Sequence, residues 1–139
     1  MRLVDASVFV HAFLKPKREL KPHERAIKEG AKAIVRRINE GEEVAMTAVQ
    51  LAEIANLLEA HMSLEIAFKV EEFLIEAPNI SILTVDRKIC SEALKVSRKY
   101  GVGLSDAIAY VSMMREGIAE VYSFDRDFDR LPEVRRVVE

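Results

Sequence analysis

Six aspartates are the side chains of this sequence whose placement most suggests chemistry. They are scarce, because the 23 acidic residues divide into 17 Glu and 6 Asp. The expected secondary structure puts them where strands end or helices begin. Carboxylates at such places commonly accept hydrogen bonds from free backbone N–H groups and so cap a helix or a turn. Each one therefore has a structural explanation, and only their joint arrangement can indicate a function. The six are Asp5, Asp86, Asp106, Asp125, Asp127 and Asp129.

The surroundings of individual aspartates leave both explanations open. Asp5 interrupts an apolar run at residues 3–10. A carboxylate there costs free energy unless it is paired, hydrogen-bonded or bound to a cation, so function and a cap on the turn at Ser7 explain it equally well. Asp106 follows Ser105, the expected N-cap of a helix, where the helix dipole favours negative charge. Asp86 is predicted to be an ordinary N-cap.

Acids in two further segments complete the candidates. Glu53 lies two turns into a helix that the capping-box pattern Thr47-Ala48-Val49-Gln50 predicts. Its apolar neighbours place it at the boundary of the buried face, and a plain exposed Glu is the alternative. Asp125 and Asp127 follow a strand. Their alternate spacing directs both to one side only if the backbone stays extended, and we expect a turn to separate them.

The elements that must position these acids alternate between strands and helices. Such alternation predicts parallel βαβ units and a sheet covered on both faces. Ligands of such sheets bind beyond the carboxyl ends of the strands. With 139 residues, the chain is expected to form one domain over residues 1–139. The expected strands are residues 2–4, 43–46, 80–85, 118–124 and 134–138, and the expected helices are residues 7–14, 23–40, 47–60, 63–75, 86–100 and 105–116.

The helix expected at residues 63–75 is amphipathic. Its apolar spacing predicts a buried face that packs on the rest of the molecule. The members of this face are Leu64, Ala67, Phe68, Phe73 and Leu74.

The expected sheet would bring Asp5, Asp106 and Asp125 to one edge, and Glu53 would reach the same edge from its helix. Four ionised carboxylates drawn together repel one another. A hard divalent cation such as Mg²⁺ or Mn²⁺ relieves the repulsion, prefers oxygen ligands and keeps waters for substrate phosphates. Such ions activate water and neutralise charge in phosphodiester cleavage. The arrangement therefore predicts a metal site for phosphodiester chemistry.

The charge balance limits how a polyanion could bind. With 21 basic and 23 acidic residues the formal net charge is −2, which excludes a strongly basic coat and leaves only local patches. An aromatic content of 6% argues against a base-stacking platform. The alternative for the basic residues is a solvated loop face or ion pairs with neighbouring Glu. The candidates for RNA contact are Lys15, Lys17, Arg18, Arg126 and Arg130.

Other chemistries have little support. Cys90 is the one cysteine, so it forms no internal disulfide, and the pattern suits a reducing cytoplasm. No apolar run approaches the roughly 18 residues typical of a membrane span. His11, His23 and His61 are scattered, and neither a Ser-His-Asp arrangement nor a glycine-rich phosphate loop is present.

Four segments of the chain resemble the PIN-domain ribonucleases, and their order and the chain length are similar to those of VapC-type toxins. The resemblance covers nearly the whole chain, and its last two segments are the most specific. It implies an α/β/α sandwich around a mostly parallel sheet and a metal-dependent endoribonuclease. The segments are Val4-Asp5-Ala6-Ser7, Glu53 in the helix that begins at Thr47, Leu104-Ser105-Asp106-Ala107-Ile108-Ala109-Tyr110, and Tyr122-Ser123-Phe124-Asp125-Arg126-Asp127-Phe128.

The resemblance also implies roles and partners. It makes an acidic quartet catalytic and metal-ligating for Mg²⁺ or Mn²⁺, and it implies a homodimer and a small antitoxin protein as partner. The basic insertion at residues 15–22 departs from the family pattern, so contacts there need not follow it. The quartet is Asp5, Glu53, Asp106 and Asp125, and the supporting candidates are Ser7, Ser123 and Asp127.

Two other functions remain as alternatives. A receiver-like phosphoryl-transfer domain needs a second acid beside a nucleophilic Asp, and Asp5-Ala6-Ser7 offers no such pair. A catalytically weak PIN-fold module would instead bind RNA or protein. The leading prediction is a cytoplasmic endoribonuclease, the toxin of a toxin–antitoxin pair.

Overall fold

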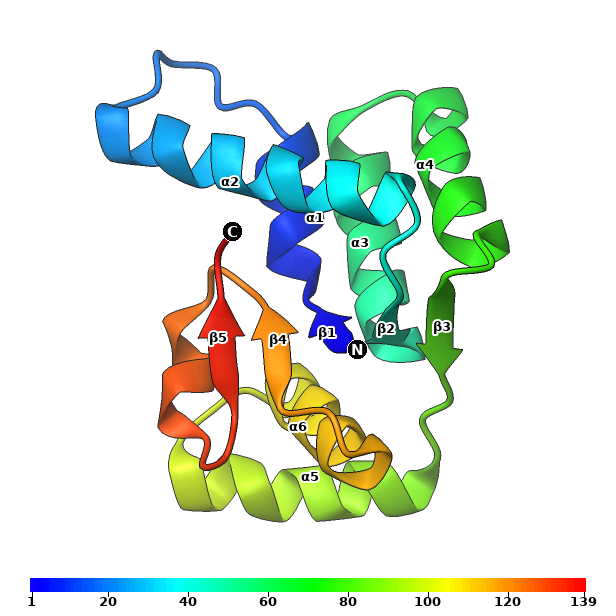
Figure 1. The fold of residues 1–139 in the computed structure, drawn as a ribbon, viewed down its shortest axis with the longest axis vertical. Coiled ribbons are helices and arrows are strands. Elements are labelled where there is room, and N and C mark those ends of the chain that lie inside the picture. The colour runs from blue at the N-terminus through cyan, green and yellow to red at the C-terminus, as the bar shows by residue number, and fades with distance from the viewer.

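A parallel five-stranded sheet forms the centre of the computed structural model, which describes residues 1–139 (Figure 1). The strand order is β3-β2-β1-β4-β5, and every neighbouring pair is parallel. All carboxyl ends therefore lie at the same edge, with β1 in the middle. The strands are β1 (Arg2–Val4), β2 (Val44–Thr47), β3 (Ile80–Leu83), β4 (Glu120–Tyr122) and β5 (Arg135–Val137).

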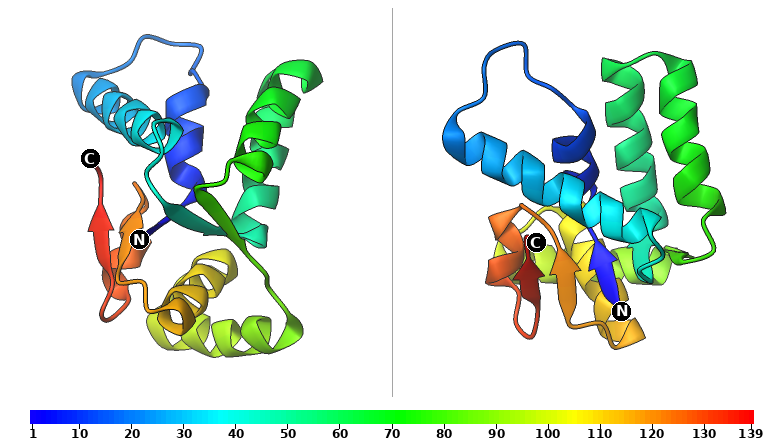
Figure 2. Two further views of the ribbon diagram at one scale, coloured as in Figure 1. Left: turned by 45° about the vertical axis from the view of Figure 1, so that its right-hand side comes forward. Right: turned by 45° about the horizontal axis from the view of Figure 1, so that its top comes forward.

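Helices cover both faces of the sheet (Figure 2). Successive strand residues point to opposite faces of the sheet: Val4 packs against the helices on one face and Leu3 against those on the other. This two-sided burial explains the continuous apolar strands, and the expected α/β/α sandwich is confirmed. No helix combines the length and apolar composition that a membrane crossing requires. The first layer holds α1 (Ala6–Phe13), α2 (Pro22–Asn39), α3 (Ala48–His61) and α4 (Leu64–Glu76), and the second holds α5 (Arg87–Tyr100), α6 (Leu104–Glu116) and the 3-10 helix η1 (Arg126–Arg130).

The starts of the helices show which capping predictions hold. Asp86 caps α5, since its Oδ1 accepts a hydrogen bond from the Ile89 backbone N at 2.9 Å. The expected cap at Ser105 is wrong. Gly103 occupies the N-cap position with extended backbone, so α6 begins one residue earlier, at Leu104. Asp106 is consequently the third residue of α6.

The predicted buried face of α4 is wrong in part. Ala67 and Leu74 are buried, but Leu64 is 55% and Phe68 is 54% exposed. The reason is the position of α4, which packs on α3 and on β3 at the edge strand of the sheet and leaves its other side uncovered. A stripe of apolar side chains on α4 thus faces solvent.

The chain reverses between α1 and α2, and a buried lysine holds this reversal. Lys28 of α2 donates hydrogen bonds through Nζ to the backbone oxygens of His11, Ala12 and Leu14, at 3.0, 3.4 and 3.1 Å. These carbonyls at the end of α1 lack partners within the helix. The ammonium therefore caps α1 from a neighbouring helix.

Candidate active site

Asp5 occupies the middle of the carboxyl edge because it directly follows the central strand β1. The residue is 7% exposed. Three donors hold its carboxylate: Ser123 Oγ lies 2.9 Å and the Ser7 backbone N 3.3 Å from Oδ2, and Gln50 Nε2 lies 3.3 Å from Oδ1. Asp5 is therefore the cap of α1, and the donors on both oxygens also fix its orientation toward the site.

Two serines connect Asp5 to the turn that follows β4. Ser123 Oγ lies 3.3 Å from Ser7 Oγ and accepts a hydrogen bond from the Asp125 backbone N at 3.0 Å. Ser7 Oγ accepts a hydrogen bond from the Phe124 backbone N at 3.0 Å. These contacts fix the start of α1 against the end of β4, which sets Asp5 relative to Asp125. The predicted supporting roles of the two serines stay predictions.

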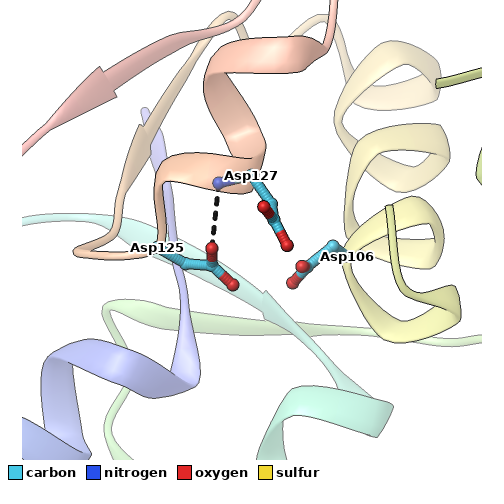
Figure 3. A group of neighbouring side chains, drawn as sticks. All are labelled: Asp106, Asp125 and Asp127. Carbon is cyan, nitrogen blue, oxygen red and sulfur yellow. Dashed lines mark hydrogen bonds between the residues drawn. The ribbon is translucent and has the colours of Figure 1, made fainter. Parts of the chain in front are cut away.

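Asp106, Asp125 and Asp127 point their carboxylates toward one another (Figure 3). One oxygen from each lies within 4.8 Å of the others. The Asp127 backbone N donates a hydrogen bond to Asp125 Oδ1 at 2.9 Å. We expected a turn to separate Asp125 from Asp127, and this is wrong, because the first turn of η1 brings Asp127 back to the same side.

Glu53 reaches the same place from α3. It lines a cavity of about 290 Å³ together with Asp5, Asp106 and Asp125. Its Oε1 atom is buried and has no hydrogen-bond partner. The structure thus brings all four acids of the predicted quartet to one cavity, while their catalytic roles stay a prediction.

Crowding changes the protonation of two of these acids. Burial, together with the charges of Asp5 and Asp125, raises the pKa of Asp106 to about 7. Burial also raises the pKa of Glu53; the Ser105 side chain lowers it in part, and the charge of Asp5 raises it again. Burial is the largest cause of both pKa shifts, the neighbouring carboxylates add to it, and no Lys or Arg offsets them.

The residues present fit a hard divalent cation. The potential ligands are carboxylate oxygens, which Mg²⁺ and Mn²⁺ prefer. The unpartnered Oε1 of Glu53 and the raised pKa of Asp106 are what a cluster with room for positive charge would show.

The sequence model of the PIN domain matches residues 2–134. The chain belongs to the PIN domain family. Members of this family are generally nucleases, and the predicted family is confirmed. A search of curated protein sequences found no match to this chain.

Solved structures share the fold of this PIN domain. VapC20 from Mycobacterium tuberculosis, described as a sarcin-ricin loop cleaving toxin, is 17% identical, with a TM-score of 0.73 over 93% of each chain. A toxin–antitoxin complex from Klebsiella pneumoniae is 14% identical, with a TM-score of 0.65 over 97% of this chain and 96% of the other. VapBC2 from Rickettsia felis, bound to a DNA fragment from its promoter, is also 14% identical, with a TM-score of 0.65 over 98% and 96%. At sequence identities this low, the structural similarity shows a shared fold and nothing more.

Gln50 is a buried neighbour of Asp5 in this PIN domain that sequence reasoning missed. It is 1% exposed, and its Oε1 accepts a hydrogen bond from the Thr47 backbone N at 2.9 Å, as the capping-box pattern predicts. The same side chain donates to Asp5, which stands 45 positions earlier. The capping motif was visible in the sequence, but the contact between α3 and the end of β1 was not.

Two of the six aspartates lie apart from the site. Asp86 caps α5, and Asp129 pairs with Arg136, whose Nε lies 3.1 Å from Asp129 Oδ1. Among the histidines of this PIN domain, His11 lines the cavity. Its ring meets the Phe124 ring edge to face, with 5.4 Å between the centroids.

The basic residues predicted to contact RNA fall into two groups. Arg18 binds Glu24 through both guanidinium nitrogens at 2.8 and 2.7 Å, and Arg130 donates to the Gly101 backbone oxygen at 2.8 Å. Both guanidinium groups therefore already have partners within the chain. For Arg18 the partner is a neighbouring Glu, which is the ion pair expected as the alternative to RNA contact. The others are exposed and pair with no acid of the chain: Lys15, Lys17 and Arg126.

Proposed function

We propose that this PIN domain is a divalent-metal-dependent endoribonuclease that hydrolyses RNA phosphodiester bonds. The observation that carries the proposal is the convergence of Asp5, Glu53, Asp106 and Asp125 on one cavity. That PIN domains are generally nucleases supports it. A phosphodiester is itself an anion, so a cavity lined by acids and by no Lys or Arg suits it only when cations are bound.

Carboxylates from separate elements would hold the ion. Asp106, Asp125 and Asp127 are close enough together to share it, and Asp5 and Glu53 would ligate it, or a second ion, directly or through water. Bound Mg²⁺ or Mn²⁺ supplies a water of lowered pKa and positive charge beside the phosphate.

The chain's own contribution is to position these ligands. Ser123 and Gln50 hold the two oxygens of Asp5, and the Ser123 hydroxyl also holds the Asp125 backbone. Preorganised ligands need no rearrangement when the substrate arrives, which lowers the barrier of the chemical step. The mutual fixation of Asp5 and Asp125 therefore adds structural support for the proposed chemistry.

The similar structures support a toxin role. They include toxins solved with antitoxins, and one is described as cleaving the sarcin-ricin loop. By extension, we take RNA as the substrate of this chain and a small antitoxin protein as its partner. The predicted compartment is the cytoplasm, in keeping with the free thiol of Cys90.

A homodimer is also part of the proposal, and the exposed stripe on α4 supports it. Leu64, Phe68 and Ile75 are each more than half exposed, at 55%, 54% and 54%, and their spacing puts them on one side of the helix. Apolar side chains grouped in this way commonly mark interfaces. Sedimentation velocity should show a dimer that Phe68→Glu converts to a monomer. A monomeric native chain, or a dimer unaffected by Phe68→Glu, contradicts this part.

The decisive experiment for the enzyme is cleavage of RNA by the purified protein. We expect cleavage with Mn²⁺ or Mg²⁺, none with EDTA, and loss of at least about a thousandfold in rate with Asp5→Asn, because a metal ligand is removed. Asp129→Asn is the matched control, since the same change there lies outside the cavity. Cleavage that persists in Asp5→Asn would sink the proposal, and metal binding without cleavage would favour the catalytically weak PIN-fold module.

A further inference from the structure

A groove adjoins the acid cavity along α1. The segment between α1 and α2, the start of α2 and the last residue of α3 line it, and it encloses about 500 Å³. This volume is within the range of about 300–1,000 Å³ typical of small-molecule sites. It thus has room for a heterocyclic base, and the proposed metal chemistry does not use it.

The groove and the acid cavity share two lining residues. Val10 and His11 line both of them. On α3, Leu57 lines the cavity and His61, one turn later, lines the groove, where its Nδ1 lies 2.9 Å from the Leu57 backbone oxygen. A chain whose scissile phosphate lay among the acids would therefore enter this groove with its next nucleotide.

The charge of the groove is opposite to that of the cavity. Lys15 and Lys17 stand at its rim, are exposed and pair with no acid. The one acid in its lining, Glu24, is already neutralised by Arg18, whose hydrogen bonds lower the pKa of Glu24 to about 2. Lys28 adds a further positive charge below them, held by the carbonyls of α1. The groove is therefore positive beside a negative centre.

The floor of the groove is apolar. Val10, Leu14, Leu20 and Ile27 form it. Single-stranded nucleic acids bind where cations track the backbone phosphates and flat or apolar side chains accept the faces of the bases. The floor and rim together have these two properties, beside the acid cavity.

We propose that this groove binds the RNA nucleotide next to the scissile phosphate, with its base on the apolar floor and its phosphate at Lys15 and Lys17. The inference rests on the proposed ribonuclease function. Unpaired lysines beside an acidic centre favour RNA, which carries a phosphate at every nucleotide, over a peptide without acidic side chains. In this proposal the basic segment at residues 15–22 forms part of the RNA-binding site.

The first test is the affinity for a fluorescein-labelled, single-stranded RNA of about 12 nucleotides, measured by anisotropy with Mn²⁺ and the Asp5→Asn variant to prevent cleavage. Lys15→Glu with Lys17→Glu should raise the Kd at least about tenfold and flatten its dependence on salt, because phosphate contacts release counterions. The matched control is Lys88→Glu with Lys95→Glu, two exposed lysines of α5 in the opposite layer. It should change the Kd less than about twofold.

A second variant separates the floor from the rim. Leu20→Ser should raise the Kd by about threefold or more and leave the salt dependence unchanged, since a base contact carries no counterion. Thermal melting checks that each variant is folded. If all folded groove variants bind RNA as tightly as the control, the inference is overturned.

Cross-linking tests the groove without relying on cleavage. Oligouridylate containing 4-thiouridine should cross-link the unmodified protein within residues 10–20, and the lysine variant should lose this product. Cross-links confined to other segments, or a co-purified protein that occupies the groove while RNA does not cross-link there, overturn the inference. An unmodified protein that cross-links in the groove but cleaves no RNA refutes the ribonuclease proposal and leaves the groove as an RNA-binding site, so the two failures are distinct.

Discussion

Asp106 shows what the crowding of the cavity means for a single residue. Burial and the charges of Asp5 and Asp125 raise the pKa of its carboxyl to about 7, so without a cation this group is partly protonated at neutral pH. Metal ions bind carboxylates in the ionised form and displace the proton. Metal binding should therefore weaken as the pH falls below about 7. One side chain thus links folding stability, pH and metal affinity.

Asp106→Asn should stabilise the metal-free protein at alkaline pH. The folded pKa of about 7 exceeds the ordinary value of 3.8. Between these values the native state binds more protons than the unfolded state, so its stability is lost as the pH rises through them. The partly exposed position screens the effect to about 1 kcal/mol. Urea denaturation in EDTA at about pH 5 and pH 8 measures it.

The comparison of variants isolates this group from the other carboxyls. Asp106→Asn should flatten the fall in stability between the two pH values, and Asp129→Asn should leave it as in the unmodified protein, because Asp129 lies outside the cavity. Equal pH dependence in both variants would show that Asp106 does not hold the proton.

Gln50 is the residue whose contribution is least visible in the sequence. Gln50→Glu keeps an acceptor for the Thr47 backbone N but replaces the amide that donates to Asp5 with a carboxylate oxygen. Repulsion between the two carboxylates should turn Asp5 and lower RNA cleavage at least about tenfold. Asn56→Asp, the same change on the exposed side of α3, is the control. A folded Gln50→Glu protein that cleaves at the unmodified rate contradicts the assigned positioning role.

At the scale of elements, the segment between α1 and α2 lines the groove that lies beside the acid cavity. The ammonium of Lys28 reaches across from α2 to three carbonyls at the end of α1. Because α1 directly follows its cap Asp5 and ends at the groove, this contact fixes one wall of both sites. The packing of α2 on α1 therefore helps to set the shape of the acid cavity and of the groove.

Lys28→Met should lower the free energy of unfolding by about 2 to 3 kcal/mol, because the carbonyls lose a charged donor while the apolar stem is kept. Chemical denaturation gives the value. Lys32→Met is the matched control, since its ammonium is exposed and lies 3.9 Å from Glu29, and it should cost less than about 0.5 kcal/mol. Similar losses in both variants would mean that the ammonium of Lys28 is not an important cap.

The elements also show what the sequence could and could not predict. Alternating strands and helices suffice to place Asp5 and Asp125 at one sheet edge, because parallel strands end on the same side. Periodicity did not show that Phe68 would be exposed, since α4 packs on α3 and on the edge strand β3 and leaves its other side uncovered. The contacts of Gln50 with Asp5 and of Lys28 with the end of α1 depend on how separate elements pack. No local sequence pattern predicts them.

At the scale of the whole molecule, the formal net charge of −2 conceals two opposite regions. The acids gather at the middle of the carboxyl edge, and the free lysines stand along the adjoining groove. A negative centre repels RNA until cations occupy it, whereas the groove attracts the phosphates on one side. If the chain is the proposed ribonuclease, we therefore expect RNA binding, as well as cleavage, to depend on divalent metal.

Anomalous diffraction from a crystal grown with Mn²⁺ tests the central claim most directly, because it locates the ion independently of activity. The account predicts a peak inside the cavity, at about 2.0 to 2.3 Å from carboxylate oxygens of Asp106 and Asp125, with Asp5 and Glu53 in direct or water-mediated contact. Asp106→Asn should remove or weaken the peak, and Asp129→Asn should leave it unchanged. A cavity without a peak in the unmodified protein at saturating Mn²⁺ would contradict the metal centre and the nuclease built on it.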